Sequence, residues 1–203
     1  MQQCLFSDNE SQSLPLADAK VQYLANWLAN KTANSLFDLF LEELDWREGT
    51  INIFGKTVKI PRLQAWYGDP GTDYAYSGVN MRPLPWHREL HLLKTQCERQ
   101  CETQFNSVLA NLYRHGQDSM GMHSDDEPEL GSEPIIASVS LGELRNFDFK
   151  HKVSGAKFRL PLEHGSLLIM SGETQKFWQH GIAKTKQLLQ PRLNFTFRRV
   201  LVK

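Results

Sequence analysis

The sequence has few cysteines and no long apolar run. Its three cysteines, Cys4, Cys97 and Cys101, are an odd and sparse set among 203 residues, which excludes a disulfide scaffold and indicates a reducing compartment. No window approaches the roughly 18 apolar residues of a membrane-spanning helix. The N-terminus also lacks a basic segment followed by an apolar one, the pattern of a secretion signal. We therefore expect a monomeric cytoplasmic protein that makes no membrane contact.

The sequence also has no excess of positive or negative charge. Lys plus Arg equal Asp plus Glu at 23 each, so any nucleic-acid binding must depend on a local basic patch. Candidates for that patch are Lys56, Lys59, Arg62 and Arg82. The hydrophobic content of 40% and the absence of repeats and low-complexity linkers predict one globular domain over residues 1–203. Within it, residues 1–14 are polar and are expected to be loose.

Two segments have the apolar spacing of helices. Residues 16–44 place Val21, Leu24 and Leu28, and later Leu39 and Phe40, at helical intervals. Ser35 and Asp38 resemble a helix start. A second helix is predicted over residues 87–103, where Leu90, Leu93, Cys97 and Cys101 share one face. On that face the two cysteines are interpreted as core residues in preference to metal ligands.

Short β-prone segments make up most of the rest. "INIFGKTVKI", residues 51–60, predicts a hairpin around Gly55 and Lys56. After Phe105 the predicted strands are "NSVLANLYR", "PIIASVSLG", "NFDFKHK", "KFRLPL", "GSLLIM", "KFWQHGIAK" and "RLNFTFRRVLV". Many short strands separated by Gly, Pro and Asp indicate a β-sandwich or barrel.

Residues 121–127, "GMHSDDE", combine a histidine with three acidic residues. A solvated acidic turn with an isolated histidine would explain this composition without any function. In an extended segment, however, His123 and Asp125 point to the same side. His180, in a late predicted strand with aromatic neighbours, would complete a set of two histidines and one carboxylate. That set leaves coordination positions open and is the ligand set of non-haem Fe(II) oxygenases.

The last predicted strand, "PRLNFTFRR", has one fully polar side. Arg192, Asn194, Thr196 and Arg198 alternate with Leu193, Phe195 and Phe197. If the polar side faces solvent, nothing more follows. If it faces the interior, the buried guanidinium groups require an anion, because an unpaired buried charge costs several kcal/mol. Asn111 and Tyr113 alternate in the same way and are suited to neutral hydrogen bonds with a small dicarboxylate.

Taken together, these motifs resemble the AlkB family of Fe(II)- and 2-oxoglutarate-dependent dioxygenases. The resemblance is carried by "PRLQAWYGD", "YAYSG", "NLYRHGQDSMGMHSDDEPEL", "PIIASVSLG", "LEHGSLLIM", "QKFWQH" and "PRLNFTFR" and runs from about residue 51 to 200. It implies a mainly β fold, a double-stranded β-helix or jelly roll with flanking N-terminal helices. The catalytic core would occupy about residues 105–203 and a nucleotide-recognition lid about residues 51–82.

The resemblance also implies a role for individual residues. His123, Asp125 and His180 would hold Fe(II). The cosubstrate 2-oxoglutarate would be bound by Asn111, Tyr113, Arg192, Asn194, Thr196 and Arg198. A nucleotide would be contacted by Phe54, Gly55, Lys56, Tyr74, Ala75, Tyr76 and Asp126.

The implied reaction is the oxidative demethylation of alkylated nucleobases, of the 1-methyladenine and 3-methylcytosine type. It consumes O2 and 2-oxoglutarate and releases succinate, CO2 and formaldehyde. The surroundings of "HSDDEPEL" resemble members that favour single strands and RNA, whereas "FGK" and "RNFDFKHK" resemble duplex-DNA members, so both choices stay open. Two alternatives are a dioxygenase that acts on a protein or small metabolite and a catalytically silent binding module.

Overall fold

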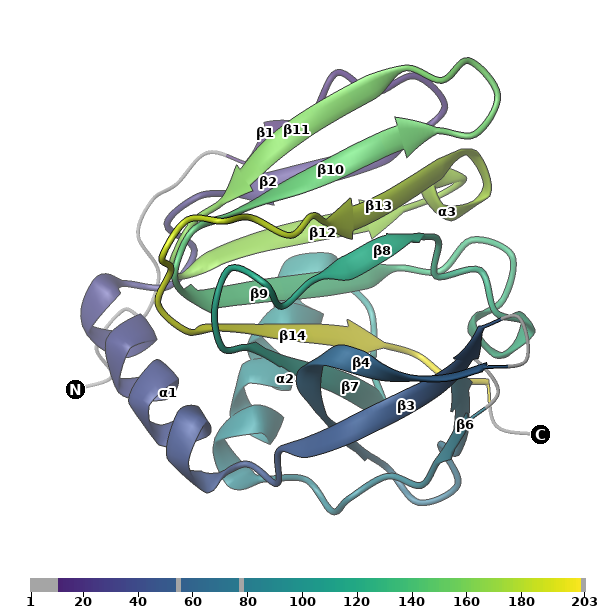
Figure 1. Cartoon of the computed structure of the whole chain (residues 1–203). Helices are drawn as coiled ribbons and strands as arrows, with labels where there is room; N and C mark the ends of the chain where they lie inside the picture. The colour runs from purple at the N-terminus through teal and green to yellow at the C-terminus, as the bar shows by residue number, and fades with distance from the viewer. Residues whose placement is uncertain (1–10, 54–55, 77–78, 202–203) are drawn as a thin grey trace.

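Two antiparallel sheets dominate the computed structural model, which describes residues 11–53, 56–76 and 79–201 (Figure 1). The main sheet contains, in spatial order, β1 (Gln12–Ser13), β2 (Lys20–Leu24), β12 (Ser166–Ser171), β9 (Ile136–Gly142), β14 (Arg192–Arg198), β7 (Ser107–Tyr113), β4 (Lys56–Gly68) and β3 (Arg47–Ile53). The minor sheet contains β11 (Lys157–Leu162), β10 (Arg145–His151), β13 (Trp178–Ile182) and β8 (Met120–His123). A separate hairpin is formed by β5 (Tyr74–Tyr76) and β6 (Val79–Met81).

From β7 onward the chain alternates between the two sheets, except that β10 and β11 form a hairpin within the minor sheet. β7, β9, β12 and β14 belong to the main sheet, and β8, β10, β11 and β13 to the minor sheet. The sheets lie over one another (Figure 1), and a core cluster with Phe149, Leu162 and Leu168 packs between them. This is the double-stranded β-helix, so the predicted fold class is confirmed. Strands β1 to β4, from before residue 105, extend the main sheet on both sides.

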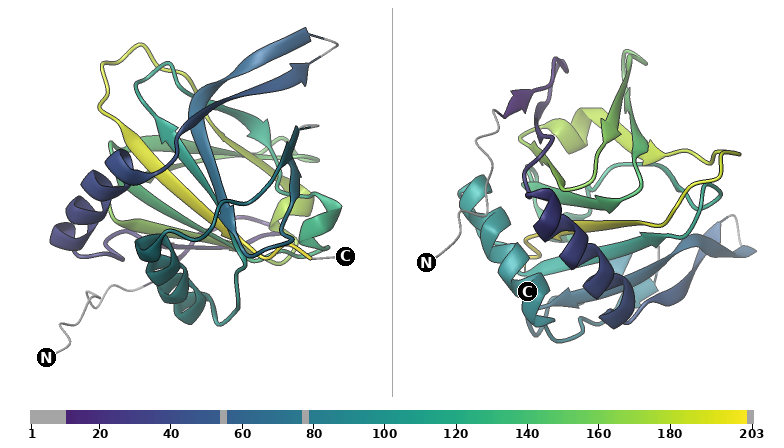
Figure 2. Two further views of the ribbon diagram at one scale, coloured as in Figure 1. Left: turned by 90° about the horizontal axis from the view of Figure 1, so that it is seen from below. Right: turned by 90° about the vertical axis from the view of Figure 1, so that its left-hand side faces the viewer.

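The helices cover the outer face of the main sheet (Figure 2). These are α1 (Asn30–Glu43) and α2 (Arg88–Cys101). A short α3 (Thr174–Phe177) lies elsewhere, between β12 and β13 in the chain. The Phe40 ring of α1 packs 4.9 Å from the Phe195 ring of β14. The prediction of a helix over residues 87–103 is confirmed. Its Cys97 is fully buried, and burial raises the pKa of Cys101 to about 12, which keeps that thiol protonated.

The predicted helical course of residues 16–44 is wrong in its first part. Residues 20–24 form β2, in which Val21 and Tyr23 are buried and pair with Met170 and Leu168 of β12. Apolar positions three apart, such as Val21 and Leu24, fit a helix, but pairing with β12 satisfies the backbone and buries alternate side chains. The helix begins at Asn30, earlier than the predicted start at Ser35.

The seven strands predicted after Phe105 are all present, and the predicted hairpin at residues 51–60 corresponds to β3 and β4. The tip of that hairpin, Phe54 and Gly55, lies outside the described residues. No helix in the described part of the chain is long and apolar enough to cross a membrane.

Candidate metal centre

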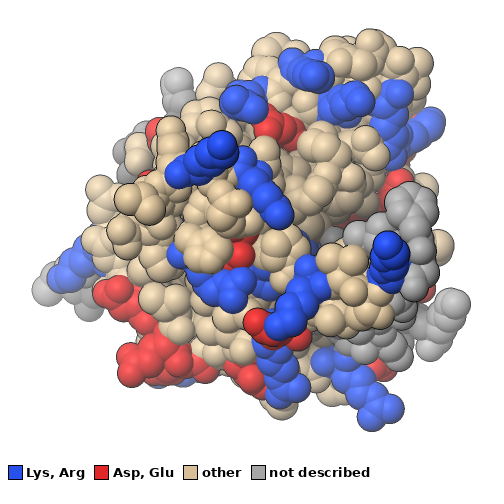
Figure 3. Space-filling view, viewed as in Figure 1, with Lys and Arg blue, Asp and Glu red and all other residues tan. Residues whose placement is uncertain are grey.

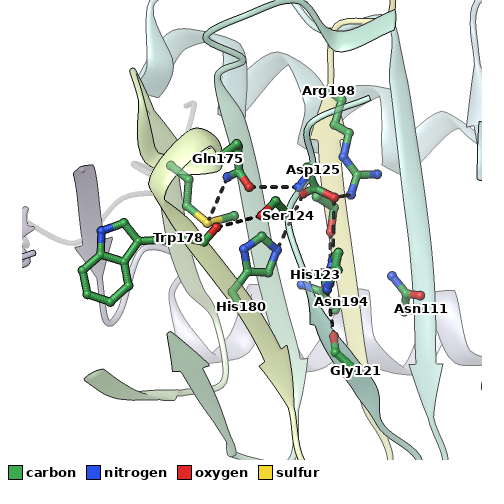
Figure 4. A network of polar contacts seen from close by, with 12 residues as sticks. Asn111, Gly121, His123, Ser124, Asp125, Gln175, Trp178, His180, Asn194 and Arg198 are labelled. Carbon is green, nitrogen blue, oxygen red and sulfur yellow. Dashed lines mark hydrogen bonds and ion pairs between the residues drawn. The ribbon is translucent and has the colours of Figure 1, made fainter. Parts of the chain in front are cut away.

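The three predicted metal ligands meet between the two sheets (Figure 4). His123 ends β8 and is paired in register with His180 of β13, and Asp125 follows two residues later. His123 Nε2 lies 3.7 Å from Asp125 Oδ1, and His180 Nε2 lies 3.8 Å from Asp125 Oδ2. One ligand atom from each residue lies within 4.8 Å of the other two. The pleat and the strand pairing therefore form the cluster from residues far apart in sequence.

The protonation of these groups suits a metal ion. Burial lowers the pKa of His180 to about 3, so its imidazole is neutral and has a lone pair to donate. Burial by itself would raise the pKa of Asp125, but Arg198 and the two histidines outweigh it and hold that pKa at about 2. His123 Nδ1 lies 2.9 Å from the Gly121 carbonyl, and a proton donated there leaves Nε2 as the ligand atom. Two imidazoles and one carboxylate fit Fe(II) with open positions.

A pocket extends from these ligands into the space between the sheets. It is lined by Leu109, Asn111, Tyr113, Met120, His123, Asp125, Ser138, Phe147, Met170, His180, Ile182, Asn194, Thr196 and Arg198. Every residue of β14 is buried, so the polar side of this strand faces the interior and the solvent-facing alternative is excluded. Arg198 Nη2 donates to Asp125 Oδ1 at 2.8 Å and joins β14 to the metal ligands.

Arg192 is a buried cation that has no carboxylate partner among the described residues. Its side chain is 1% exposed, and Nη2 donates to Ser140 Oγ at 2.9 Å. The guanidinium carbon lies 5.2 Å from the centre of the Tyr113 ring. Nε and Nη1 are buried without a hydrogen-bond partner in the described structure. Burial lowers the pKa of Arg192 to about 10, so the group stays charged at neutral pH. A buried guanidinium in this state requires an anion.

The amide and hydroxyl groups predicted for the same pocket are partly occupied with one another. Asn194 Nδ2 donates to Ser138 Oγ at 2.8 Å, and Thr196 Oγ1 donates to Asn194 Oδ1 at 3.1 Å. Asn111 Oδ1 accepts from Arg62 Nε at 2.8 Å and from Gln64 Nε2 at 3.0 Å. Together with Tyr113, these side chains form a polar surface between Arg192 and the metal ligands.

The prediction that Arg62 contributes to a surface basic patch is wrong. Arg62 is 3% exposed, and its Nη1 donates to the Ser119 carbonyl at 3.0 Å. Its position in β4 turns it toward β7, where it supports Asn111. The sequence showed the positive charge but not which side of the strand it occupies.

Sequence reasoning missed several residues of the site, namely Arg62, Gln64, Ser138, Ser140, Phe147 and Gln175. Phe147 stacks on His180 with ring centres 5.1 Å apart. The serines had a signal: Ser138 and Ser140 alternate in "IASVSLG" just as Arg192 and Asn194 alternate in β14. Gln175 opens the motif "QKFWQH", but it precedes β13 in a segment without periodicity that could have indicated a contact with Asp125.

Of the predicted nucleotide contacts, Lys56 and Asp126 have described side chains. Asp126 is an exposed residue whose Oδ2 lies 3.1 Å from Lys152 Nζ, and it does not line the pocket. Lys56 is exposed at the start of β4. Tyr74, Ala75 and Tyr76 form β5, and their side chains, like the whole of Phe54 and Gly55, lie outside the described residues.

Comparison with known proteins adds a family match to this geometry. Residues 20–198 match the 2OG-Fe(II) oxygenase superfamily. The chain is 40% identical over 196 residues to alpha-ketoglutarate-dependent dioxygenase alkB homolog 3 of Bos taurus, with 92% of this chain and 68% of that protein covered. It is 41% identical over 181 residues to DNA oxidative demethylase ALKBH2 of Mus musculus, with 83% and 75% covered. The solved structure of OsALKBH1 superposes with a TM-score of 0.66 at 17% identity over 94% of this chain and 100% of that one, a likeness of fold.

Proposed function

The chain belongs to the AlkB family within the 2OG-Fe(II) oxygenase superfamily, and from this premise we propose that it demethylates alkylated nucleobases in DNA by oxidation. One observation carries the cofactor part of the proposal. The pocket contains a ligand set of two histidines and one carboxylate. The buried Arg192, which lies against Tyr113 of the pocket wall, has no anionic partner among the described residues. Fe(II) fits the ligand set and the distal carboxylate of 2-oxoglutarate fits Arg192.

Each part of the pocket has a defined task in this reaction. His123, Asp125 and His180 would hold Fe(II), and Arg192 with Tyr113 would bind the far carboxylate of 2-oxoglutarate. Asn111 and Arg198 would lie at the end of 2-oxoglutarate that meets the metal, while Asn194 and Thr196 line the wall between. Bound Fe(II), with 2-oxoglutarate and O2, supplies the oxidising power that hydroxylates the alkyl carbon, which then leaves as formaldehyde. The protein orients the reactants and excludes water.

The substrate class rests on the relatives and on surface charge. The relatives with the printed name DNA oxidative demethylase act on DNA, and we carry this class over to the present chain. On the face seen in Figure 3, Lys and Arg side chains spread over the minor sheet, whereas Asp and Glu gather near α1. Lys150, Lys157 and Arg159 line a depression of the minor sheet, in which Arg159 is paired with Asp148 and the two lysines supply the excess positive charge. A protein without net charge therefore still presents a basic surface to a phosphate backbone.

Formaldehyde release from methylated oligonucleotides tests the proposal directly. We expect release from DNA that carries 1-methyladenine or 3-methylcytosine, and none from the unmodified sequence. The panel contains single- and double-stranded DNA and the matching RNA, so the same experiment determines strand preference and sugar preference. Succinate formation without formaldehyde from any of these substrates would point to a protein or metabolite substrate and contradict the proposal.

Phe54 and Asp126 are expected to affect substrate binding in different ways. Base–aromatic stacking contributes roughly 1–3 kcal/mol, so Phe54→Ala should slow demethylation by about one to two orders of magnitude. The loss should be larger on duplex, where a base pair must be opened, than on single strands. Asp126→Ala should slow both substrates alike, because its carboxylate would meet the base only after flipping.

The control for this pair is the slow succinate formation that occurs without nucleic acid. Both variants should keep it, since neither residue is assigned to the metal or to 2-oxoglutarate. Equal losses on duplex and single strand for Phe54→Ala would reject its role in base opening.

A further inference from the structure

The loop that carries Asp125 is hydrogen-bonded to Gln175 of α3 and to the first residue of β13 (Figure 4). The Asp125 N–H donates to Gln175 Oε1 at 2.9 Å, and Ser124 Oγ donates to the Trp178 carbonyl at 2.9 Å. Two consecutive residues of the ligand loop are thus bonded to a segment that ends at the third ligand, His180. These bonds run directly between the two pieces of chain that supply the metal ligands.

A lysine in the turn after β10 extends this connection. Lys152 Nζ donates to the Gln175 carbonyl at 2.8 Å and to Asp126 Oδ2 at 3.1 Å. We call Ser124, Lys152 and Gln175 together the ligand clamp. Its members come from the ligand loop, from the turn after β10 and from α3, three segments that are separate in sequence.

Backbone pairing by itself leaves this region weakly fixed. β8 and β13 pair at His123 with His180 and at Met120 with Ile182, and the register shifts between these two points. The ladder ends at His123, so the position of Asp125 depends on bonds made outside the sheet. The amide acceptor of Gln175 is the partner that the structure gives to the Asp125 N–H.

The Gln175 amide is buried and has a hydrogen-bond partner at each end. It is 2% exposed, and its Nε2 lies 3.6 Å from Met170 Sδ, so both ends of the amide have a neighbour. Burying an amide is unfavourable unless its hydrogen bonds are made. An apolar side chain would fill the same space without this cost. The hydrogen bond from the Asp125 N–H therefore explains why an amide is buried at this position.

We propose that Gln175 is a positioning residue of the metal centre, supported by Ser124 and Lys152, which fixes the Asp125 carboxylate relative to His123 and His180. The inference deepens the proposed function, since it concerns how the same site holds its metal. Supporting contacts of this kind typically change metal affinity by about 10- to 100-fold. Gln175 does not line the pocket beside the metal ligands, so its effect should appear in metal binding.

The test is metal affinity measured without nucleic acid. Co(II) is titrated into the apoprotein with 2-oxoglutarate at saturation, and binding is followed by calorimetry and by the visible absorption of the Co(II) site. Gln175→Leu keeps the volume and removes the acceptor, and Gln175→Asn keeps the amide but is one methylene too short to reach. Gln179→Leu, the same change in β13 away from the loop, is the matched control. Ser124→Ala removes the second bond with little change in packing.

We expect Gln175→Leu and Gln175→Asn to weaken Co(II) binding by about 10- to 100-fold. Ser124→Ala should weaken it by about 2- to 10-fold, the range for one hydrogen bond. Gln179→Leu should match the wild type. If both Gln175 variants bind Co(II) like the wild type, or if Ser124→Ala binds like the wild type when the Gln175 variants fail to fold, the proposal is overturned. Because no oligonucleotide is present, this result is independent of whether the wild type demethylates DNA.

Discussion

Replacing either His123 or Asp125 by alanine should reduce formaldehyde and succinate formation to background, even with Fe(II) in excess. A facial set of three ligands cannot lose one member and still hold the metal in the geometry that the reaction needs. His123 and Asp125 should nevertheless differ in stability. The His123 side chain is 22% exposed, whereas Asp125 is 1% exposed and bonded to Arg198. Removing a buried ion-pair partner typically costs about 3–5 kcal/mol.

Two measurements check this expectation. Turnover is assayed at saturating Fe(II) and 2-oxoglutarate, and unfolding of the apoprotein is followed by thermal denaturation. His123→Ala should unfold close to the wild type, and Asp125→Ala at a clearly lower temperature. Asp126→Ala is the matched control for loss of a carboxylate: it should slow demethylation but keep succinate formation without nucleic acid, which His123→Ala and Asp125→Ala should lose. Full turnover in His123→Ala or Asp125→Ala would remove that residue from the ligand set.

Arg192→Met should raise the concentration of 2-oxoglutarate needed for half-maximal turnover far more than it lowers the maximal rate. The change keeps most of the buried volume and deletes the cation that lies against Tyr113 of the pocket wall without an anionic partner among the described residues. Losing one side of a buried, hydrogen-bonded charge pair typically costs about 2–5 kcal/mol, or roughly 30- to 5,000-fold in affinity.

An analogue of the cosubstrate provides a control for the role of Arg192. 2-Oxopentanoate has the same carbon chain as 2-oxoglutarate but a methyl group in place of the distal carboxylate. The wild type should strongly prefer 2-oxoglutarate, and Arg192→Met should lose most of that preference, because the coupling between the two charges is gone. An unchanged preference would show that another group binds the distal carboxylate.

The sequence by itself was sufficient for the class of fold and for the three side chains that meet at the candidate metal centre. The predicted strands after Phe105 are all present, because alternation of apolar and polar residues follows directly from the pleat. The same alternation placed His123 beside Asp125 and put Arg192 and Arg198 on one side of β14. His180 was identified by its chemistry, since two ligands required a third.

Only the tertiary structure decided which way each polar group faces and what it touches. Periodicity could not show that residues 20–24 pair with β12, because Val21, Tyr23 and Leu24 contain both the two-residue spacing of a strand and the three-residue spacing of a helix. Arg62 carried the charge of a surface residue but lies buried against Asn111. Gln175 reaches Asp125 across 50 residues of sequence, a contact that no local pattern encodes. Periodicity indicates which side of a single strand or helix is buried, whereas these contacts depend on how two elements pack against each other.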